Sequence, residues 1–195
     1  MKCAKTRKCK AKDCHNRFEP SKPFIEWCSD DCAALIGVAR LDKIKASQAR
    51  KERVETKRKL DKIKTKSDWL KEAQKAFNLY IRLRAIRFGH TCISSGTPLQ
   101  ISGIGGGFDA GHYRSIGSAP HLRFNLNNVW GQSKQDNRYG SGASFEYRRG
   151  LIERRGIEIV EGLEANDEFR KYDIPYLIRI KDIFTRKAKR MKARI

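Results

Sequence analysis

The stretch CKAKDCHNRFEPSKPFIEWCSDDC, residues 9–32, contains four cysteines in the pattern C-x4-C-x13-C-x3-C. Two close pairs of thiolates separated by a loop are typical of a tetrahedral zinc site, in which each Zn–S distance is about 2.3 Å. The second pair precedes an apolar run that suits a helix beginning at Cys32. We therefore predict a structural zinc module over residues 1–36, with the ligands Cys9, Cys14, Cys28 and Cys32.

Two disulfides, or free thiols, are the alternative interpretation of these cysteines. A disulfide framework needs an oxidising compartment, and the basic N-terminus has no apolar run behind it that would make a secretory signal. The pattern therefore favours zinc and a reducing cytosol. Cys3 or His15 could replace one of the four ligands, and the sequence leaves that choice open.

The charge of the chain predicts an anionic partner. Its 195 residues include 43 Lys and Arg against 22 Asp and Glu, which gives a formal net charge of +21. Self-repulsion of this size is offset by solvent or by an anionic partner, and nucleic acid is the default partner. An anionic membrane is the weaker alternative, because no segment is apolar for long enough to span a bilayer.

Residues 37–66 are rich in charge and contain no proline and, after Gly37, no glycine. Most of these residues are good helix formers, but the apolar ones are too sparse for a core-facing stripe. We predict a basic helical linker, with a charged spacer that makes no contacts as the alternative. A stronger helix is expected at 67–87, where apolar residues recur at helical spacing and Thr65 and Asp68 have the spacing of a capping box.

Glycine, serine and asparagine become common over residues 90–142. Strand-like pieces occur at Phe108–His112 and at His121–Phe124. The run Gly103–Gly107 lacks the Lys-Ser/Thr pair of a phosphate-binding P-loop, so we predict a hairpin tip there.

Two more helices are expected, at Phe145–Ala165 and at Ile174–Lys192, the second with Pro175 in its first turn. We therefore predict a mostly helical α+β fold. Its third domain, residues 67–195, would hold the strand-like pieces and the flanking helices.

Four residues of the glycine-rich region form a candidate catalytic site: Asp109, His112, Asn128 and Asn137. Histidine, carboxylate and amide side chains in a strand–loop–strand–helix context are typical of the ββα-metal, or HNH, nuclease site. There a near-neutral histidine takes a proton from the attacking water, and one divalent cation stabilises charge on the phosphate. The alternative is that these are incidental loop residues, but the basic charge and the zinc module favour a nuclease core.

Six motifs follow one another along the chain: CHNRFEP, WCSDDC, TCISSGT, DAGHYRS, APHLRFNLNN and SKQDNRYGSG. Their order resembles the NinG/Rap recombination proteins of lambda-like phages, over nearly the whole chain. The resemblance implies a structure-specific, metal-dependent endonuclease that acts on branched DNA, such as D-loops and Holliday junctions, in phage homologous recombination. It also implies a location in the host cytoplasm and phage or host recombination proteins as partners. Junction enzymes are often homodimers, since symmetric nicking needs two active centres, but the sequence leaves the oligomeric state open.

The resemblance assigns roles by position. His112 would be the general base, Asn128 the middle asparagine of the HNH pattern, and Asn137 its last residue and a Mg²⁺ ligand. In many such sites the acidic ligand directly precedes the histidine, where this chain has Gly111. Asp109, two residues further back and on the same strand face as Gly111, is our candidate for that Mg²⁺ ligand.

The chain departs from the family pattern at a second zinc site, which in relatives comprises two C-x-x-C pairs. Here the corresponding pairs are Cys92–Ser95 and Ser133–Asp136, so one of the four thiolates remains. Serine is a poor zinc ligand, so we expect no second structural zinc, and packing must offset the lost folding free energy. Asp136 would be an extra metal ligand or a solvated acid.

The missing thiolates raise an alternative function, that of a non-catalytic DNA-junction-binding accessory protein in recombination. A third interpretation, suggested by the basic zinc module alone, is an RNA-binding or translation-associated protein.

Overall fold

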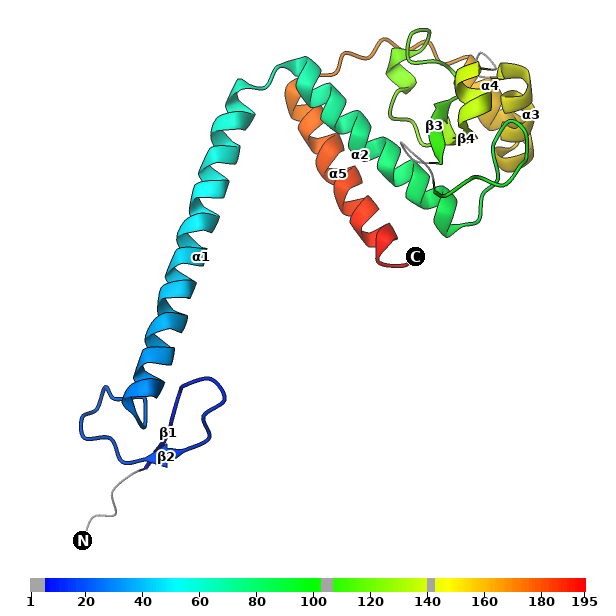
Figure 1. Ribbon diagram of the computed structural model, residues 1–195. Helices are drawn as coiled ribbons and strands as arrows, with labels where there is room; N and C mark the ends of the chain where they lie inside the picture. Colours follow the sequence, from blue (N-terminus) through cyan, green and yellow to red (C-terminus); the bar gives the residue numbers. More distant parts are fainter. Residues whose placement is uncertain (1–5, 103–106, 140–142) are drawn as a thin grey trace. The chain divides into compact units, whose positions relative to one another are not determined.

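The computed structural model describes residues 6–102, 107–139 and 143–195. Within these ranges the chain is mostly helical and has two antiparallel sheets of two strands each, which confirms the predicted α+β class (Figure 1). Two compact units are formed, Met1–Ile63 and Lys64–Ile195. Among the described helices, none has the length and hydropathy of a bilayer-spanning segment.

The first unit contains a small hairpin and one long helix. Strand β1 (Arg7–Lys8) pairs antiparallel with β2 (Arg17–Phe18), and helix α1 (Asp30–Ile63) follows. Ser29 caps α1, because its Oγ accepts the backbone N–H of Cys32 at 3.3 Å. The helix therefore begins two residues before the predicted start at Cys32.

Helix α1 runs without a break through residues 37–63 of the charge-rich stretch, which confirms that this part is helical. In this fully described helix the only buried residue is Ile36, which packs with the cysteines. The remaining turns are solvated, as the sparse apolar residues predicted.

The second unit is built on helices α2 (Lys66–Arg87) and α5 (Ile174–Lys192). The predicted capping box at the start of α2 is confirmed: the Thr65 hydroxyl accepts the N–H of Asp68, and the Asp68 carboxylate accepts the N–H of Thr65 at 3.0 Å. Helix α5 has its predicted bounds and is capped by the carboxylate of Asp173.

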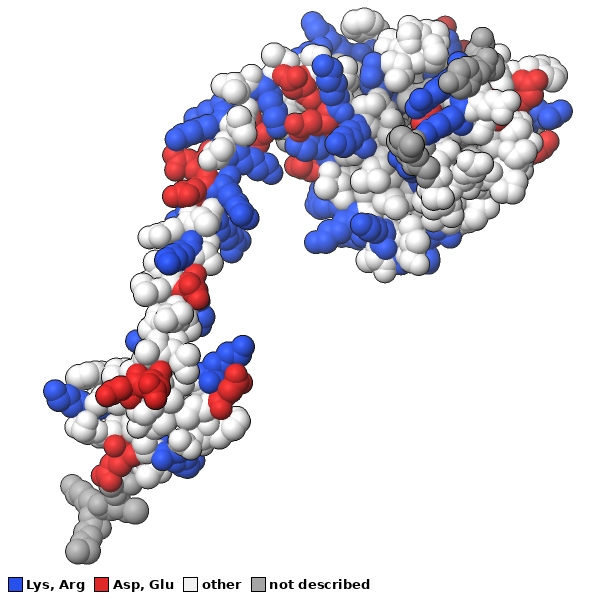
Figure 2. Space-filling view, in the orientation of Figure 1, with Lys and Arg blue, Asp and Glu red and all other residues white. Residues whose placement is uncertain are grey.

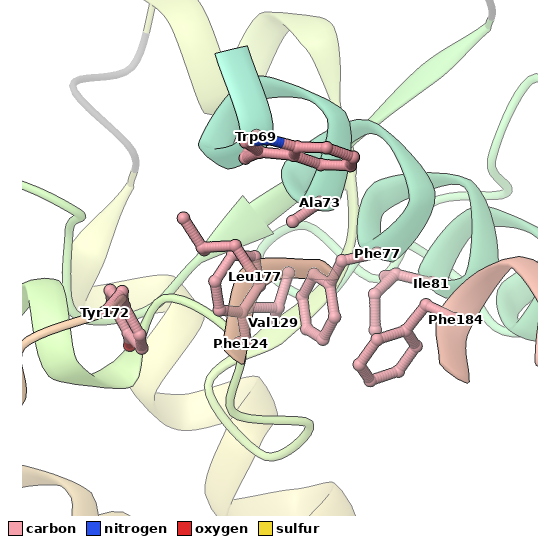
Figure 3. Close-up of a cluster of buried hydrophobic side chains, with 9 residues drawn as sticks. All are labelled: Trp69, Ala73, Phe77, Ile81, Phe124, Val129, Tyr172, Leu177 and Phe184. Atoms are coloured by element: carbon pink, nitrogen blue, oxygen red, sulfur yellow. The ribbon is translucent and has the colours of Figure 1, made fainter. Parts of the chain in front are cut away.

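Helices α2 and α5 lie side by side and run in the same direction (Figure 1). Near their starts Glu72 contacts Lys181 at 2.6 Å, and further along the ring centroids of Phe77 and Phe184 are 4.7 Å apart. The apolar stripe predicted for α2 forms the main core with α5 and the second hairpin. The buried members are drawn in Figure 3: Trp69, Ala73, Phe77, Ile81, Phe124, Val129, Tyr172, Leu177 and Phe184.

The second hairpin, which packs against α2, pairs β3 (Phe108–His112) with β4 (Val129–Ser133). Strand β3 has its predicted bounds, but the predicted strand at His121–Phe124 is wrong. Pro120–Leu122 form the 3-10 turn η1 instead, because the fixed φ of proline suits the first position of such a turn.

After β4 come the π-helical turn η2 (Gln135–Tyr139) and the helices α3 (Ser144–Arg155) and α4 (Ile157–Glu164). The prediction of one helix over 145–165 is wrong, because Gly156 at φ +85° ends α3. Helices α3 and α4 and one face of β4 share a second core, with the buried residues Ile93, Ala119, Leu122, Trp130, Tyr147, Leu151, Val160 and Leu163. The predicted hairpin tip at Gly103–Gly107 lies, apart from Gly107, outside the described residues.

Candidate metal centre and candidate active site

The four predicted zinc ligands lie together and form what we call the cysteine cluster: Cys9, Cys14, Cys28 and Cys32. The Sγ–Sγ distances are 3.6 Å for Cys14–Cys28 and 3.7 Å for Cys28–Cys32, and all four sulfur atoms lie within 4.8 Å of one another. A tetrahedral site with Zn–S bonds of about 2.3 Å has S–S edges of about 3.8 Å, whereas a disulfide needs about 2.05 Å. The cluster could therefore hold a metal ion such as zinc.

The same geometry excludes one alternative for the cysteines. None of the four forms a disulfide, so the disulfide interpretation is wrong for them. His15 is not part of the cluster, and Cys3 lies outside the described residues.

Backbone hydrogen bonds bring the segments of the cluster together. The N–H of Cys9 donates to the carbonyl of Asn16 at 2.9 Å, and Asp13 turns the loop with φ +63°. Lys10 joins this loop to the next segment by donating its N–H to the carbonyl of Glu26 at 2.8 Å. Cys32 lies on the first turn of α1, so the helix positions the last ligand.

The thiol pKa values explain why this arrangement favours a cation. Burial raises the pKa of Cys9, but hydrogen bonds from the backbone of Ala11 and Cys28 and from neighbouring thiols bring it to about 7. A backbone hydrogen bond from Asn16 lowers the pKa of Cys14, but the Cys28 sulfur and burial raise it to about 12. Four neighbouring thiolates repel one another, so they can all ionise together only around a positive ion.

His112 ends β3, and its ring is held in one orientation. Its Nε2 lies 3.1 Å from the carbonyl of Arg123, and because a carbonyl can only accept, the proton is assigned to Nε2 and the lone pair to Nδ1. Burial lowers the pKa of the His112 ring. The hydrogen bond to the backbone carbonyl of Arg123 opposes this effect, and the positive charge of the Arg123 side chain adds to it. The ring is therefore neutral at physiological pH, which is the form that a general base requires.

Asn128 is fully buried and holds the loop between β3 and β4. Its Oδ1 accepts the N–H of Arg114 at 2.8 Å, and its Nδ2 donates to the carbonyls of Arg114 at 3.0 Å and Leu122 at 3.3 Å. These bonds join the two ends of the connection that starts directly after His112. Asn128 therefore fixes the loop and does not itself face the solvent.

Asn137 on η2 contacts Asp109 on β3, with 3.1 Å between Nδ2 and Oδ2. Arg138 forms a two-pronged ion pair with the same carboxylate, at 2.9 Å and 3.3 Å. A cation bound at Asp109 would therefore have to share this carboxylate with Arg138 or replace it.

His112 and Asn137 line one cavity of about 650 Å³ at the end of the second hairpin. The other described residues of its wall are Tyr113, Arg114, Ser115, Ile116, Ser118, Ser144 and Glu164. Asp109 and Asn128 are not among these wall residues. The structure thus brings His112 and Asn137 to a common space and places Asp109 and Asn128 as partners behind them.

Glu164, at the end of α4, is a wall residue that sequence reasoning missed. Arg148 donates to both of its carboxylate oxygens, at 2.8 Å and 3.1 Å, and the Tyr113 hydroxyl donates to one of them. These bonds lower the pKa of Glu164, which is therefore ionised. No local motif marks this glutamate, because only the packing of α4 brings it beside the residue that follows His112.

Cys92, Ser95, Ser133 and Asp136 converge on one point, and we call them the Asp136 cluster. The Oδ2 atom of Asp136 accepts the Cys92 thiol at 3.1 Å, the Ser95 hydroxyl at 2.9 Å and the Ser133 hydroxyl at 2.8 Å. The bonds from Cys92 and the two serines lower the pKa of Asp136 against the opposing effect of burial. Asp136 is thus not the solvated acid of the sequence-based alternative, and hydrogen bonds occupy the positions at which relatives are expected to hold zinc.

Lys and Arg outnumber Asp and Glu in the chain, 43 to 22, and Figure 2 shows many of their side chains on the face of the second unit that is drawn. Helix α5 contains a single acidic residue, Asp182. Its exposed basic residues are Arg179, Arg186, Lys187, Lys189, Arg190 and Lys192. This helix can therefore contact several phosphates at once.

Comparison with known proteins matches the chain along its whole length. The family model described as bacteriophage lambda NinG protein matches residues 1–194. Protein ninG of Escherichia phage lambda is 35% identical over 197 residues, covering 95% of this chain and 93% of that protein. Protein ninG of Salmonella phage P22 is 34% identical over 197 residues, covering 95% and 94%, and that of Enterobacteria phage H19B is 34% identical over 201 residues, covering 97% and 96%. No solved structure gives a significant match.

Proposed function

The chain belongs to the NinG family of phage proteins, and from that premise we propose that it is a metal-dependent endonuclease for branched DNA in phage homologous recombination. The observation that carries the proposal is the cavity shared by His112 and Asn137, in which the histidine is neutral and held by a backbone carbonyl. The net charge of +21 supports a phosphate-rich substrate.

In this proposal the second hairpin and η2 form an HNH-like core. His112 would take a proton from the attacking water through Nδ1, while Nε2 stays bonded to Arg123. Asn128 would keep the loop after His112 in place through its three backbone hydrogen bonds. The water oxygen would form the new bond to phosphorus as the bond to the leaving oxygen breaks, and that oxygen would take up a proton from solvent.

A divalent cation, when bound, would stabilise the negative charge that develops on the scissile phosphate. Oxygen atoms of Asp109 and Asn137 fit Mg²⁺, which prefers one or two carboxylate or carbonyl ligands and keeps several waters. Arg138 would have to release Asp109 before both carboxylate oxygens could take that role.

Binding would be governed by phosphate contacts. If six to ten Lys and Arg side chains reach phosphates, the affinity should fall by about 10³–10⁵-fold between 50 and 200 mM salt. Such contacts carry little sequence information, so preference would come from the shape of the branch. Residues of α5 and of the N-terminal unit are the expected contributors.

The test is nicking of a four-way junction in the presence of Mg²⁺, with a linear duplex as substrate control. Wild type should nick the junction, and His112→Ala should lose nicking while it still binds the junction. The matched control is His121→Gln, because the Nε2 of His121 also bonds a backbone carbonyl, that of Asn166 at 2.7 Å, but His121 is not a wall residue of the cavity. Equal cleavage by wild type and His112→Ala would remove the proposed base.

A non-catalytic junction-binding protein is the second candidate function. The observation that favours it is the ion pair between Asp109 and Arg138, which already satisfies the carboxylate proposed as a metal ligand. This candidate predicts tight, salt-dependent junction binding and no cutting with Mg²⁺ or Mn²⁺. Competition with structured RNA at matched salt separates both candidates from the RNA-binding alternative.

We further propose that the protein acts in the host cytoplasm as a homodimer, together with recombination proteins of the phage or host. Two active centres are needed for symmetric nicking of a junction. Sedimentation of the protein on a four-way junction should give two chains per junction, and one chain per junction would contradict the dimer.

A further inference from the structure

Tyr147 of α3 contacts both strands of the second hairpin with one atom. Its hydroxyl accepts the N–H of Trp130 at 3.0 Å and donates to the carbonyl of Gly111 at 2.9 Å. Gly111 and Trp130 face each other across the ladder, so the hydroxyl bridges a cross-strand pair. The side chain is 1% exposed, so water does not compete for these bonds.

A buried hydroxyl is costly unless it is hydrogen-bonded on both its donor and its acceptor sides. Tyr147 meets this condition through the hairpin alone, and the carbonyl of Asn128 lies 3.4 Å from the same oxygen. Burial raises the pKa of the phenol far above physiological pH, so the group stays protonated and remains a donor. The hydroxyl can therefore donate to the carbonyl of Gly111 at physiological pH.

The bridge lies beside the candidate active site. Gly111 directly precedes His112, and the next ladder bond runs from the N–H of Tyr113 to the carbonyl of Asn128 at 2.9 Å. Any change in the spacing of the strands at Gly111 is therefore passed on to His112 and Asn128. The aromatic ring itself packs in the second core, which anchors the hydroxyl to α3.

We propose that Tyr147 is a positioning residue of the proposed nuclease site. Its hydroxyl sets the spacing between β3 and β4 at the end of β3, where His112 lies. The inference rests on the proposed function for its effect on catalysis. The structural part, a hydroxyl that holds the end of the ladder, can be tested without any activity.

The test variant is Tyr147→Phe, which keeps the ring and its packing and removes only the bridging oxygen. We expect the single-turnover nicking rate of a four-way junction to fall by about 10–100-fold, the usual effect of a displacement near 1 Å in an active site. The dissociation constant for the junction should stay within about twofold, because the bridge contacts no substrate. Val160→Ala is the matched control, since it truncates the same core on α4 and removes no hydrogen bond to the hairpin.

Amide hydrogen exchange provides the readout that does not depend on activity. In Tyr147→Phe the N–H groups of Trp130 and Tyr113 should exchange at least about tenfold faster relative to the N–H of Ile93, which donates to Gly131 on the other edge of β4. In Val160→Ala all three should change together. If wild type does not cut DNA, the proposed function is wrong. The exchange measurement still tests whether the Tyr147 hydroxyl holds β3 and β4 together.

The positioning role is overturned by a nicking rate in Tyr147→Phe equal to that of Val160→Ala. It is also overturned if the exchange of Trp130 and Tyr113 rises no more than that of Ile93.

Discussion

The cysteine cluster and the Asp136 cluster each join loops to the start of a helical segment, one in each unit of the chain. The first joins the β1–β2 region to the first turn of α1 through four thiols. The second joins the segment at Cys92–Ser95 to the start of η2 through one thiol, two hydroxyls and one carboxylate. Both gather four side chains at one point, but their chemical requirements differ.

Four thiols have no strong acceptor among them, and four thiolates repel one another, so a metal ion held by the cysteine cluster would offset that repulsion. The Asp136 cluster contains its own negative charge and three donors that point at it, so it is complete as it stands. Four side chains can therefore link a loop to a helical segment around a metal ion, as we propose for the cysteine cluster, or through hydrogen bonds to one carboxylate, as in the Asp136 cluster. We therefore expect the stability of the two units to respond differently to chelators, to substitutions in the clusters and to acid.

The largest expected effect is that of metal removal. Structural zinc contributes about 10–16 kcal/mol of binding free energy in zinc-finger peptides, so a strong chelator should unfold residues 6–36 and leave the second unit intact. Amide NMR spectra of the full chain, recorded before and after chelation, check this. The amides of Cys92 and Ser133 are the internal control.

Metal analysis adds a sharper criterion to the same experiment. We expect one zinc per chain, and Cys28→Ser should reduce this to none. Dispersed amide signals from residues 6–36 in the chelated protein would show that the cysteine cluster folds without a metal ion. Two zinc ions per wild-type chain would show that a second site, such as the Asp136 cluster, also binds one.

The second expected effect is the conversion of the Asp136 cluster into a metal site. The triple variant Ser95→Cys/Ser133→Cys/Asp136→Cys surrounds one point with four thiols, counting Cys92. Since the side chains already converge, the variant should bind a second zinc and should show the absorption of a tetrahedral thiolate site with Co²⁺.

The control for the triple variant is Ser47→Cys/Ser67→Cys, which adds exposed thiols that do not converge. It should keep one zinc per chain. A triple variant that also keeps one zinc would mean that the Asp136 cluster does not have the geometry of a tetrahedral site.

The third expected effect is on stability. Asp136→Ala leaves a thiol and two hydroxyls without their common acceptor, and hydrogen bonds to a charged group contribute about 1.5–3 kcal/mol each. Because Ser95 is exposed and can bond water, we expect a loss of about 2–4 kcal/mol in the free energy of unfolding of the second unit. Urea unfolding followed by tryptophan fluorescence measures it.

Asp182→Ala is the matched control, because Asp182 is an exposed acid on α5. Its loss should be within about 0.5 kcal/mol of zero. Equal unfolding midpoints for the two variants would show that the Asp136 cluster adds nothing to stability.

The two clusters also differ in how far the sequence predicted them. The cysteine spacing predicted which four side chains lie together, because a zinc site requires thiolates in close pairs and such pairs can be recognised directly in the sequence. The Asp136 cluster was seen only as a loss of thiolates. Its role depends on the hydrogen bond between Cys92 and Asp136, which are far apart in the sequence. No local sequence pattern predicts which distant donor will bind a given carboxylate.

The helices and strands show the same difference between local signals and tertiary contacts. Helices α2 and α5 and strand β3 were predicted with nearly correct bounds, since their periodicity, caps and Pro175 are local signals. Strand β4 was missed because VWGQS is short and is a strand only through its pairing with β3. The break between α3 and α4 was missed because the apolar residues continue past Gly156, and Glu164 was missed because α4 reaches the cavity only through tertiary packing.

The smallest expected effect is that of acid on the Asp136 cluster. Hydrogen bonds hold the pKa of Asp136 below its unfolded value of about 3.9. The contribution of this carboxylate is therefore fully present above the unfolded pKa and is lost as the pH falls through the folded pKa. Between about pH 5 and pH 2 the second unit of wild type should lose more stability than that of Asp136→Asn, which has no carboxylate to protonate. A parallel loss in Asp136→Asn would assign the acid sensitivity to other carboxylates. The next group to examine would then be Glu164, whose pKa is lowered by its bonds to Arg148.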